Sequence, residues 1–253
     1  NGIFFAATKS FKPEFWIFKS AHPMGKNKLA RFAELATFQH VLQPSKDEVL
    51  NGFALAGKWK SDFFKNDRPL VVELGCGRGE YSVALGQRDP SKNYLGIDIK
   101  GARIWEGAKK ALVDDMNHVG FLRTRIEWVK HCFAPGEIDE IWITFPDPQI
   151  KYQRAKHRMI GPAFLEVYRS LLAPEGCIHL KSDSEFLHGY LHGIIEWWGL
   201  EVVETYHDIY GQIVDKPDHV VFACQTFYEK MWLKQGKTIT YLQFKFPSSG
   251  RPG

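Results

Sequence analysis

From Leu70 onward the chain alternates between short apolar runs and longer amphipathic runs, a pattern typical of strands and helices that take turns in a parallel sheet. Strands are expected at 70–74, 94–99, 120–122, 140–144, 177–180, 202–205 and 241–246. Helices are expected at 80–87, 102–117, 161–172 and 185–198, with a last helix after Thr226. The pattern therefore predicts one doubly wound α/β domain of the Rossmann-like class, built on a mostly parallel seven-stranded sheet.

Length and charge narrow the class of protein. With 253 residues the chain is long enough for one sizeable core, and the alternation leaves no room for a second full domain. Charged residues interrupt every apolar stretch well before the roughly 18 residues that a membrane helix requires, so a membrane-spanning protein is not expected. The formal net charge of +4 permits a polyanionic partner without requiring one.

The four cysteines, Cys76, Cys132, Cys177 and Cys224, lie far apart in the sequence and form no CxxC pair. This spacing favours neither a zinc site nor a disulfide framework, so no metal is expected. A reducing cytoplasm is the expected location.

The chain divides into four expected parts, because the alternation begins only at Leu70. Residues 1–23 precede the first methionine, Met24, and lack the apolar core and small-residue cleavage site of a signal peptide. We expect them to be an extension foreign to the mature protein, with a native N-terminal arm as the alternative. Residues 24–69 are expected to pack on or extend the domain at 70–246, and residues 247–253 to form a tail.

A buried strand runs directly into three glycines and a helix in the segment 70–80, LVVELGCGRGE. Glycines there let the backbone turn sharply and approach a ligand closely. A dinucleotide-binding loop needs a glycine where this chain has Glu80, whose carboxylate would repel a phosphate. The segment instead resembles the first motif of class I S-adenosylmethionine-dependent methyltransferases. In that class Glu73 would interact with the cationic methionine portion of the cofactor, and Gly75 and Gly77 would let the cofactor lie flat on the loop. The alternative is a tight turn that binds no ligand.

A second acid, Asp98, lies at the end of the expected second strand, 25 residues after Glu73. An ionised carboxylate at this position can accept hydrogen bonds from both hydroxyls of a ribose. The alternative is an acid that caps the following helix. After the third strand, where this methyltransferase class has an acid or amide near the adenine, the chain has Arg125, so backbone groups or Ile126 are expected to make that contact.

The fourth strand ends in the loop Phe145-Pro146-Asp147-Pro148, in which two prolines bracket an acid. Each proline ring fixes its own φ and pushes the preceding residue toward extended backbone. Asp147 is therefore held at the carboxyl edge of the sheet, where ligands bind in open α/β folds. Taken alone, such an acid favours a simple turn. Because the glycine motif precedes it in the same expected sheet, we interpret Asp147 as a functional acid.

This Phe-Pro-Asp-Pro sequence, followed by Lys151 and a basic stretch, resembles the tRNA (guanine-N7)-methyltransferase family of bacteria. The resemblance covers residues 26–246 and is most specific at 73–80, 145–151, 179–183 and 226–229. Family enzymes commonly have Trp-Pro where this chain has Gln149-Ile150, so no stacking by that Trp is expected.

The resemblance implies an enzyme that uses S-adenosylmethionine to make 7-methylguanosine in tRNA, usually in the variable loop. Asp147 is then the active-site acid and also lies near the cofactor. The implied cofactor-binding positions are Glu73, Gly75, Gly77, Asp98, Arg125 and Asp147. The implied substrate-binding positions are Lys151, Asp183, Thr226, Phe227, Tyr228 and Glu229. Simpler interpretations exist, because Asp183 can cap the following helix and Thr226-x-x-Glu229 matches a capping box.

The segment from Lys151 to Arg158 holds four cations and a histidine directly after the loop. Side chains of this kind can position an RNA through its phosphates, although a solvated charged face is the commoner meaning of such a run. Guanine N7 has a lone pair and no proton, so Asp147 is expected to orient and stabilise the purine rather than to act as a base.

Two other functions remain open at this point. One is an RNA-binding S-adenosylmethionine module without catalysis, and the other is a methyltransferase that acts on a small molecule or a protein. The expected partner is tRNA, and the expected state is a monomer or a weak homodimer.

Overall fold

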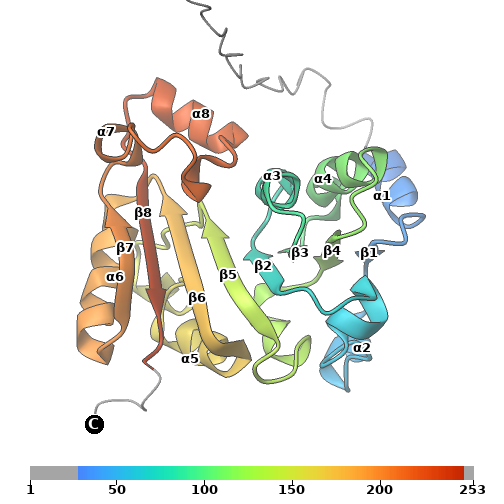
Figure 1. The fold of residues 1–253 in the computed structure, drawn as a ribbon. Coiled ribbons are helices and arrows are strands. Elements are labelled where there is room, and N and C mark those ends of the chain that lie inside the picture. The colour runs from blue at the N-terminus through green and yellow to red at the C-terminus, as the bar shows by residue number, and fades with distance from the viewer. Residues whose placement is uncertain (1–27, 248–253) are drawn as a thin grey trace, which may run out of the picture.

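The computed structural model describes residues 28–247, which form one eight-stranded sheet with helices on both faces (Figure 1). The strand order across the sheet is β1-β4-β3-β2-β5-β6-β8-β7. Neighbouring strands are parallel except that β8 is antiparallel to both β6 and β7. The strands are β1 Val41–Leu42, β2 Leu70–Leu74, β3 Asn93–Asp98, β4 Val119–Arg123, β5 Ile138–Thr144, β6 Leu172–Ser182, β7 Glu201–Tyr206 and β8 Thr240–Lys245.

Helices cover both faces of the sheet, because its central strands are apolar on both sides. The cluster on one face includes side chains of α1, α3 and α4, and the cluster on the other includes side chains of α5 and α6. The α-helices are α1 Lys28–Leu35, α2 Lys46–Leu50, α3 Glu80–Arg88, α4 Gly101–Val113, α5 Pro162–Leu171, α6 Glu185–Trp198, α7 Ile209–Gln212 and α8 Phe227–Lys234. A π-helical segment, Trp59–Phe64, and three 3₁₀ segments, Ile126–His131, Tyr152–His157 and Val220–Phe222, complete the elements of the described residues. No helix within residues 28–247 is long and apolar enough to cross a membrane.

The predicted doubly wound, mostly parallel α/β fold is confirmed, and each of the seven predicted strands is present. The predicted number of strands is wrong by one, because β1 has only two residues and shows no periodic pattern. The predicted helix 102–117 ends earlier, at Val113, where Asp115 takes a left-handed φ of 52° and breaks the helical path. Strand β6 begins at Leu172, inside the predicted helix 161–172, because Leu172 pairs with Ile138 of β5.

The described part of the segment 24–69 packs onto the sheet and its helices. Arg31 of α1 forms an ion pair with Glu106 of α4, with 2.9 Å between their nitrogen and oxygen atoms. Trp59 is completely buried, and its indole nitrogen donates a hydrogen bond of 2.8 Å to the carbonyl oxygen of Cys132. The predicted extension 1–23 and all but the first residue of the predicted tail 247–253 lie outside the described residues.

The strand order places a topological switch point between β2 and β5. From β2 the chain continues through β3 and β4 toward one edge of the sheet, whereas β5 and β6 lie on the other side of β2. Ligands of open α/β sheets bind outside the carboxyl ends of the strands at such a point. The glycine loop after β2 and the loop after β5 therefore meet at the position that the fold offers for a ligand.

Candidate active site

Three backbone nitrogen atoms of the glycine loop after β2 donate hydrogen bonds to the end of β3. The nitrogen atoms of Gly75 and Cys76 donate to the carbonyl oxygen of Ile97 at 2.8 and 3.0 Å, and the nitrogen of Gly77 donates to the Asp98 carboxylate at 3.0 Å. Gly75 and Gly77 have φ values of 76° and 56°, which other residues rarely adopt. A Cβ atom at Gly77 would have no neighbour nearer than 4.0 Å, so the loop is open where the sequence predicts a flat-lying ligand.

Glu73 lies inside the protein beneath this loop. Its carboxylate accepts hydrogen bonds from the backbone nitrogen of Ser82 at 2.9 Å, from the Ser82 hydroxyl at 2.5 Å and from the Thr144 hydroxyl at 2.7 Å. Burial raises the pKa of Glu73 to about 7, although these three donors oppose the rise. Glu73 therefore joins β2, α3 and β5.

The two carboxylate oxygens of Asp98 are held by backbone donors. One accepts from Gly77, and the other accepts from the nitrogen of Lys100 at 2.8 Å. Each oxygen retains a second lone pair for a hydroxyl donor. Asp98 thus lies where a ribose would be expected beside the glycine loop, and it does not cap the next helix, because α4 has no side-chain cap.

The two residues that follow β4, Thr124 and Arg125, have different surroundings. Arg125 is exposed, and its guanidinium lies 5.5 Å from the centre of the Trp128 ring. Its neighbour Thr124 is 2% exposed, and the Thr124 hydroxyl has no hydrogen-bond partner within residues 28–247. A buried hydroxyl without a partner is costly, so Thr124 is an additional candidate for a ligand contact. No pattern of residue types singles out Thr124, because the missing partner is a property of the tertiary structure.

The loop that carries Asp147 is strained at both ends. Phe145 and Gln149 have φ values of 49° and 46°, in the left-handed region that such side chains avoid. The nitrogen of Phe145 donates to the carbonyl oxygen of Lys181 at 2.8 Å, and the nitrogen of Gln149 donates to the Asp147 carboxylate at 3.0 Å. These bonds fix the exposed Asp147 carboxylate at the carboxyl edge of the sheet.

Two contacts bring this segment beside the glycine loop. Thr144, the last residue of β5, bonds to Glu73, as described above. A Cβ atom at Gly75 would lie 3.6 Å from the terminal carbon of Met159, so the chain after Asp147 returns over the loop. The structure therefore brings together the predicted cofactor loop and the predicted catalytic acid.

The start of α8 lies against the start of α3. The nitrogen of Phe227 donates to the Glu80 carboxylate at 3.2 Å, and the Arg78 guanidinium lies 4.7 Å from the centre of the Phe227 ring. Thr226 caps α8 by accepting from the nitrogen of Glu229 at 3.2 Å, and Phe227 and Tyr228 are partly exposed. Three of the four predicted substrate positions in this segment are thus near the glycine loop, beyond the carboxyl ends of β5 and β6 (Figure 1).

Glu229, the fourth of these positions, lies inside the protein. Its carboxylate is completely buried and pairs with the equally buried ammonium of Lys181 at 2.8 Å. It also accepts from the Tyr210 hydroxyl at 2.7 Å, while Lys181 donates to the carbonyl oxygens of Val221 and Cys224 at 2.8 and 3.2 Å. The expected direct contact of Glu229 with substrate is not what this structure shows, because its oxygens are used inside the protein.

Asp183 follows β6 at the same edge of the sheet. Its carboxylate pairs with the ammonium of Lys237 at 3.1 Å. The following helix is capped instead by Ser184, whose hydroxyl accepts from the nitrogen of Leu187 at 3.3 Å. The capping interpretation therefore applies to Ser184 and not to Asp183.

The basic run separates into two groups. Lys151, Arg154 and Lys156 are exposed, and no side-chain partner is found for them among residues 28–247. Arg158 is buried, donates at 3.2 Å to the carbonyl oxygens of residues 149 and 150, and lies over two aromatic rings of α6. The expectation that all four cations face an RNA is wrong for Arg158, which instead supports the strained loop.

The raised pKa of Glu73 makes the stability of the fold depend on pH. Its pKa is about 7 in the folded chain and near 4.5 when unfolded, so the protonated form favours folding. The contribution of protonated Glu73 to the free energy of unfolding is fully present below pH 4.5 and is lost as the pH rises through 7. Relative to Glu73→Gln, which cannot ionise, the wild-type free energy of unfolding should fall by about 1–3 kcal/mol between pH 5 and pH 8. Urea unfolding of both proteins measures this difference, and parallel pH curves would contradict the burial effect.

Comparison with known proteins agrees with this geometry. Residues 67–242 match the family model described as "Putative methyltransferase". The chain is 52% identical over 221 residues to the tRNA (guanine-N(7)-)-methyltransferase of Christiangramia forsetii, an alignment that covers 87% of this chain and 98% of that one. It is 46% identical over 229 residues to the protein of the same name from Bacteroides fragilis, with coverage of 90% and 88%.

Solved structures show the same fold at low sequence identity. An antibiotic-related methyltransferase superposes with a TM-score of 0.53 at 15% identity, covering 83% of this chain and 98% of that one. The 16S rRNA methyltransferase KamB gives 0.52 at 12% identity, with coverage of 71% and 88%. The glycine loop, the strained acid loop and these extensive sequence identities lead to one conclusion: the chain belongs to the tRNA (guanine-N(7)-)-methyltransferase family.

Proposed function

We propose that this protein transfers the methyl group of S-adenosylmethionine to N7 of a guanine in tRNA, producing 7-methylguanosine, with the variable loop as the target. The observation that carries the proposal is the meeting of the glycine loop and the strained Asp147 loop at the switch point of the sheet. The identity of 52% to a relative that the chain covers almost completely supports the same reaction.

The chain's residues fit S-adenosylmethionine at this edge. The open face of Gly77 leaves room for a ligand against the backbone, and the buried Thr124 hydroxyl, which has no partner among residues 28–247, offers a polar contact. Asp98 would accept from the ribose hydroxyls, and the buried Glu73 would respond to the cationic methionine portion. Backbone groups around Arg125 would face the adenine, since the exposed Arg125 side chain lies over Trp128.

The chain's main chemical task is positioning. S-adenosylmethionine supplies a methyl group on a cationic sulfonium, and guanine N7 offers a lone pair that needs no deprotonation. Asp147 would accept hydrogen bonds from the N–H groups of the purine and stabilise the positive charge that the purine gains. Because Phe145 and Gln149 fix the backbone around it, Asp147 loses little freedom when the guanine binds.

Product analysis tests the reaction and the role of Asp147 together. Labelled S-adenosylmethionine and unmodified tRNA are incubated with the protein, and the RNA is digested to nucleosides. We expect label in 7-methylguanosine, and a single-turnover rate about 10²-fold lower for Asp147→Asn, because one preorganised charge interaction is lost. Asp67→Asn, an exposed acid at the opposite, amino end of β2, is the matched control and should keep the normal rate.

Other results would separate the alternatives. Label on protein, on a small molecule or on adenine would replace this reaction by another methyl transfer. Binding of both ligands without any transfer would indicate a module without catalysis. A near-normal rate for Asp147→Asn would show that another group stabilises the purine.

The exposed cations Lys151, Arg154 and Lys156 support an RNA partner. They follow Asp147 directly, so a polyanion bound to them lies beside the proposed site of transfer. Contacts of lysine and arginine with phosphates position a nucleic acid without reading its bases. Binding should therefore depend strongly on salt.

A paired substitution tests this surface. Lys151→Ala with Lys156→Ala should weaken tRNA binding by about tenfold at low salt and reduce the slope of log K against log salt by about 1–2, since two phosphate contacts are lost. The matched control is Lys46→Ala with Lys58→Ala, two exposed lysines. Lys46 begins α2, away from the carboxyl edge of the sheet (Figure 1), and Lys58 lies between Gly57 and Trp59, whose nitrogens donate to Glu137 just before the amino end of β5. Filter binding across a salt series measures the tRNA affinity and the salt slope of each double variant. Equal losses of affinity in the two double variants would mean that tRNA does not bind at Lys151 and Lys156.

We also propose the oligomeric state, the location and the domain organisation of the protein. We expect activity as a monomer or a weak homodimer. Its four free thiols suit a reducing cytoplasm. The packing of α1 and Trp59 supports residues 24–69 as an extension of the methyltransferase domain at 70–246.

A further inference from the structure

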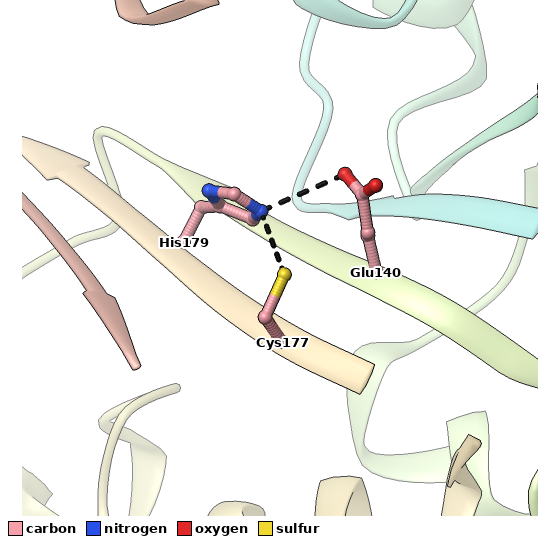
Figure 2. Close-up of side chains that lie close together, drawn as sticks. All are labelled: Glu140, Cys177 and His179. Atoms are coloured by element: carbon pink, nitrogen blue, oxygen red, sulfur yellow. Dashed lines mark hydrogen bonds and ion pairs between the residues drawn. The ribbon is translucent and has the colours of Figure 1, made fainter. Parts of the chain in front are cut away.

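Three side chains of types that can bind a metal ion, Glu140, Cys177 and His179, meet on one face of the sheet, away from the proposed active site. The register of β5 and β6 sets Glu140 opposite Cys177, and His179 lies two residues farther along β6 on the same face. Figure 2 shows all three side chains pointing toward one another. No sequence pattern indicates this group, because Glu140 is far from the two β6 residues in the chain.

The ligand atoms are spaced almost as a zinc ion requires. His179 Nε2 lies 3.2 Å from Cys177 Sγ and 3.6 Å from Glu140 Oε2, and the three atoms lie within 4.8 Å of one another (Figure 2). Tetrahedral zinc, with bonds of about 2.0–2.1 Å to nitrogen and oxygen and about 2.3 Å to sulfur, holds nitrogen about 3.6 Å from sulfur and about 3.4 Å from oxygen. Side-chain shifts of about 1 Å or less would close the site.

Each of these three residues also has an outer partner that leaves its ligand atom available. Lys92 donates to Glu140 Oε1 at 2.7 Å, which leaves Oε2 facing His179. The Tyr241 hydroxyl lies 2.8 Å from His179 Nδ1, which directs Nε2 toward Cys177. Metal-binding residues are generally oriented by such partners.

Gln243 and Trp142 hold Cys177 and His179 in place. The side-chain nitrogen of Gln243 lies 3.3 Å from Cys177 Sγ, where it can donate to a thiolate. The His179 ring is stacked on Trp142, with 3.9 Å between the ring centres and an angle of 2°. The histidine therefore has little freedom to turn away, and an ion would find its ligand already oriented.

A cleft of about 240 Å³ offers a path from solvent to the group. It is lined in part by Glu140, Trp142 and Lys92, and the Glu140 side chain is 22% exposed, whereas that of His179 is 5% exposed. Solvent can thus reach the group from the glutamate side. A metal bound there would have three protein ligands and a fourth position open to water.

We propose that Glu140, Cys177 and His179 form a binding site for one zinc ion. A thiolate, an imidazole and a carboxylate are the ligands that zinc commonly uses, and the thiolate disfavours magnesium and calcium. Binding displaces the thiol proton and any proton on Nε2 to solvent. The ion would join β5, which leads to the Asp147 loop, to β6, which leads to Asp183, and so would stabilise the sheet beneath the active site.

Cobalt titration of the full-length protein tests this site. After treatment with a chelator, Co²⁺ should bind at one ion per chain and produce a near-ultraviolet thiolate-to-cobalt charge-transfer band, which Zn²⁺ should then abolish. Cys177→Ser should lose the band, and Glu140→Gln should weaken binding at least tenfold. Cys224→Ser, a thiol outside the group, is the matched control and should keep the band. Excess Zn²⁺ should also raise the thermal unfolding midpoint of the wild type but not of Cys177→Ser.

Three outcomes would overturn the proposal. The first is wild-type protein without a charge-transfer band, a result that needs no variant to fold. The second is a band that survives in Cys177→Ser. The third is cobalt binding without thiolate character, which would point to the pair His188 and His192, whose Nε2 atoms lie 3.2 Å apart on α6.

Discussion

The fully buried ion pair between Lys181 and Glu229 is the interaction on which the active-site edge depends. Lys181 ends the apolar part of β6, and its ammonium is enclosed by Glu229 and by two carbonyl oxygens of the segment before α8. Neither side chain is exposed. Taking two charges out of water is costly, and only close pairing with further hydrogen bonds offsets that cost. Here the pairing fixes the segment 221–229 onto the end of the sheet.

The same lysine also holds the loop of Asp147. Its carbonyl oxygen accepts from the nitrogen of Phe145, the first strained residue of that loop. Strained backbone persists only where surrounding structure determines it, and here Lys181 acts on one side and the buried Arg158 on the other. The Asp147 loop and α8 thus meet at Lys181, whose ammonium also lies 5.9 Å from the centre of the Phe145 ring. Such fixed positions would serve the proposed reaction, because guanine N7 methylation depends on position more than on proton transfer.

Local patterns in the sequence were sufficient to predict the scaffold and the position of the glycine loop. Strands β2 and β3 consist mostly of buried apolar residues, and the glycines after β2 need left-handed φ values that few other residues adopt. The roles of Arg158 and Glu229 were not predictable in this way. Both are charged residues near functional motifs, and only the tertiary structure shows that each is buried and satisfied within the protein.

Other features depended on contacts between distant segments. The two residues of β1 form a strand only because β4 is beside them. Thr124 stands out only because its buried hydroxyl lacks a partner within the described residues, which no pattern of residue types reveals. The grouping of Glu140 with Cys177 and His179 follows from the register of two strands, and cysteine spacing along the chain gave the opposite expectation.

A double-mutant cycle on Lys181 and Glu229 tests the central role of their pair most directly. The free energy of unfolding and the single-turnover rate with tRNA are measured for Lys181→Met, Glu229→Gln and the double variant. Each single change should cost about 3 kcal/mol of stability, because it leaves a buried polar partner unpaired. The double variant should be less destabilised than the sum by about 2 kcal/mol or more, while its methylation rate stays low. Strictly additive losses of stability, or a normal rate in either single variant, would contradict the account.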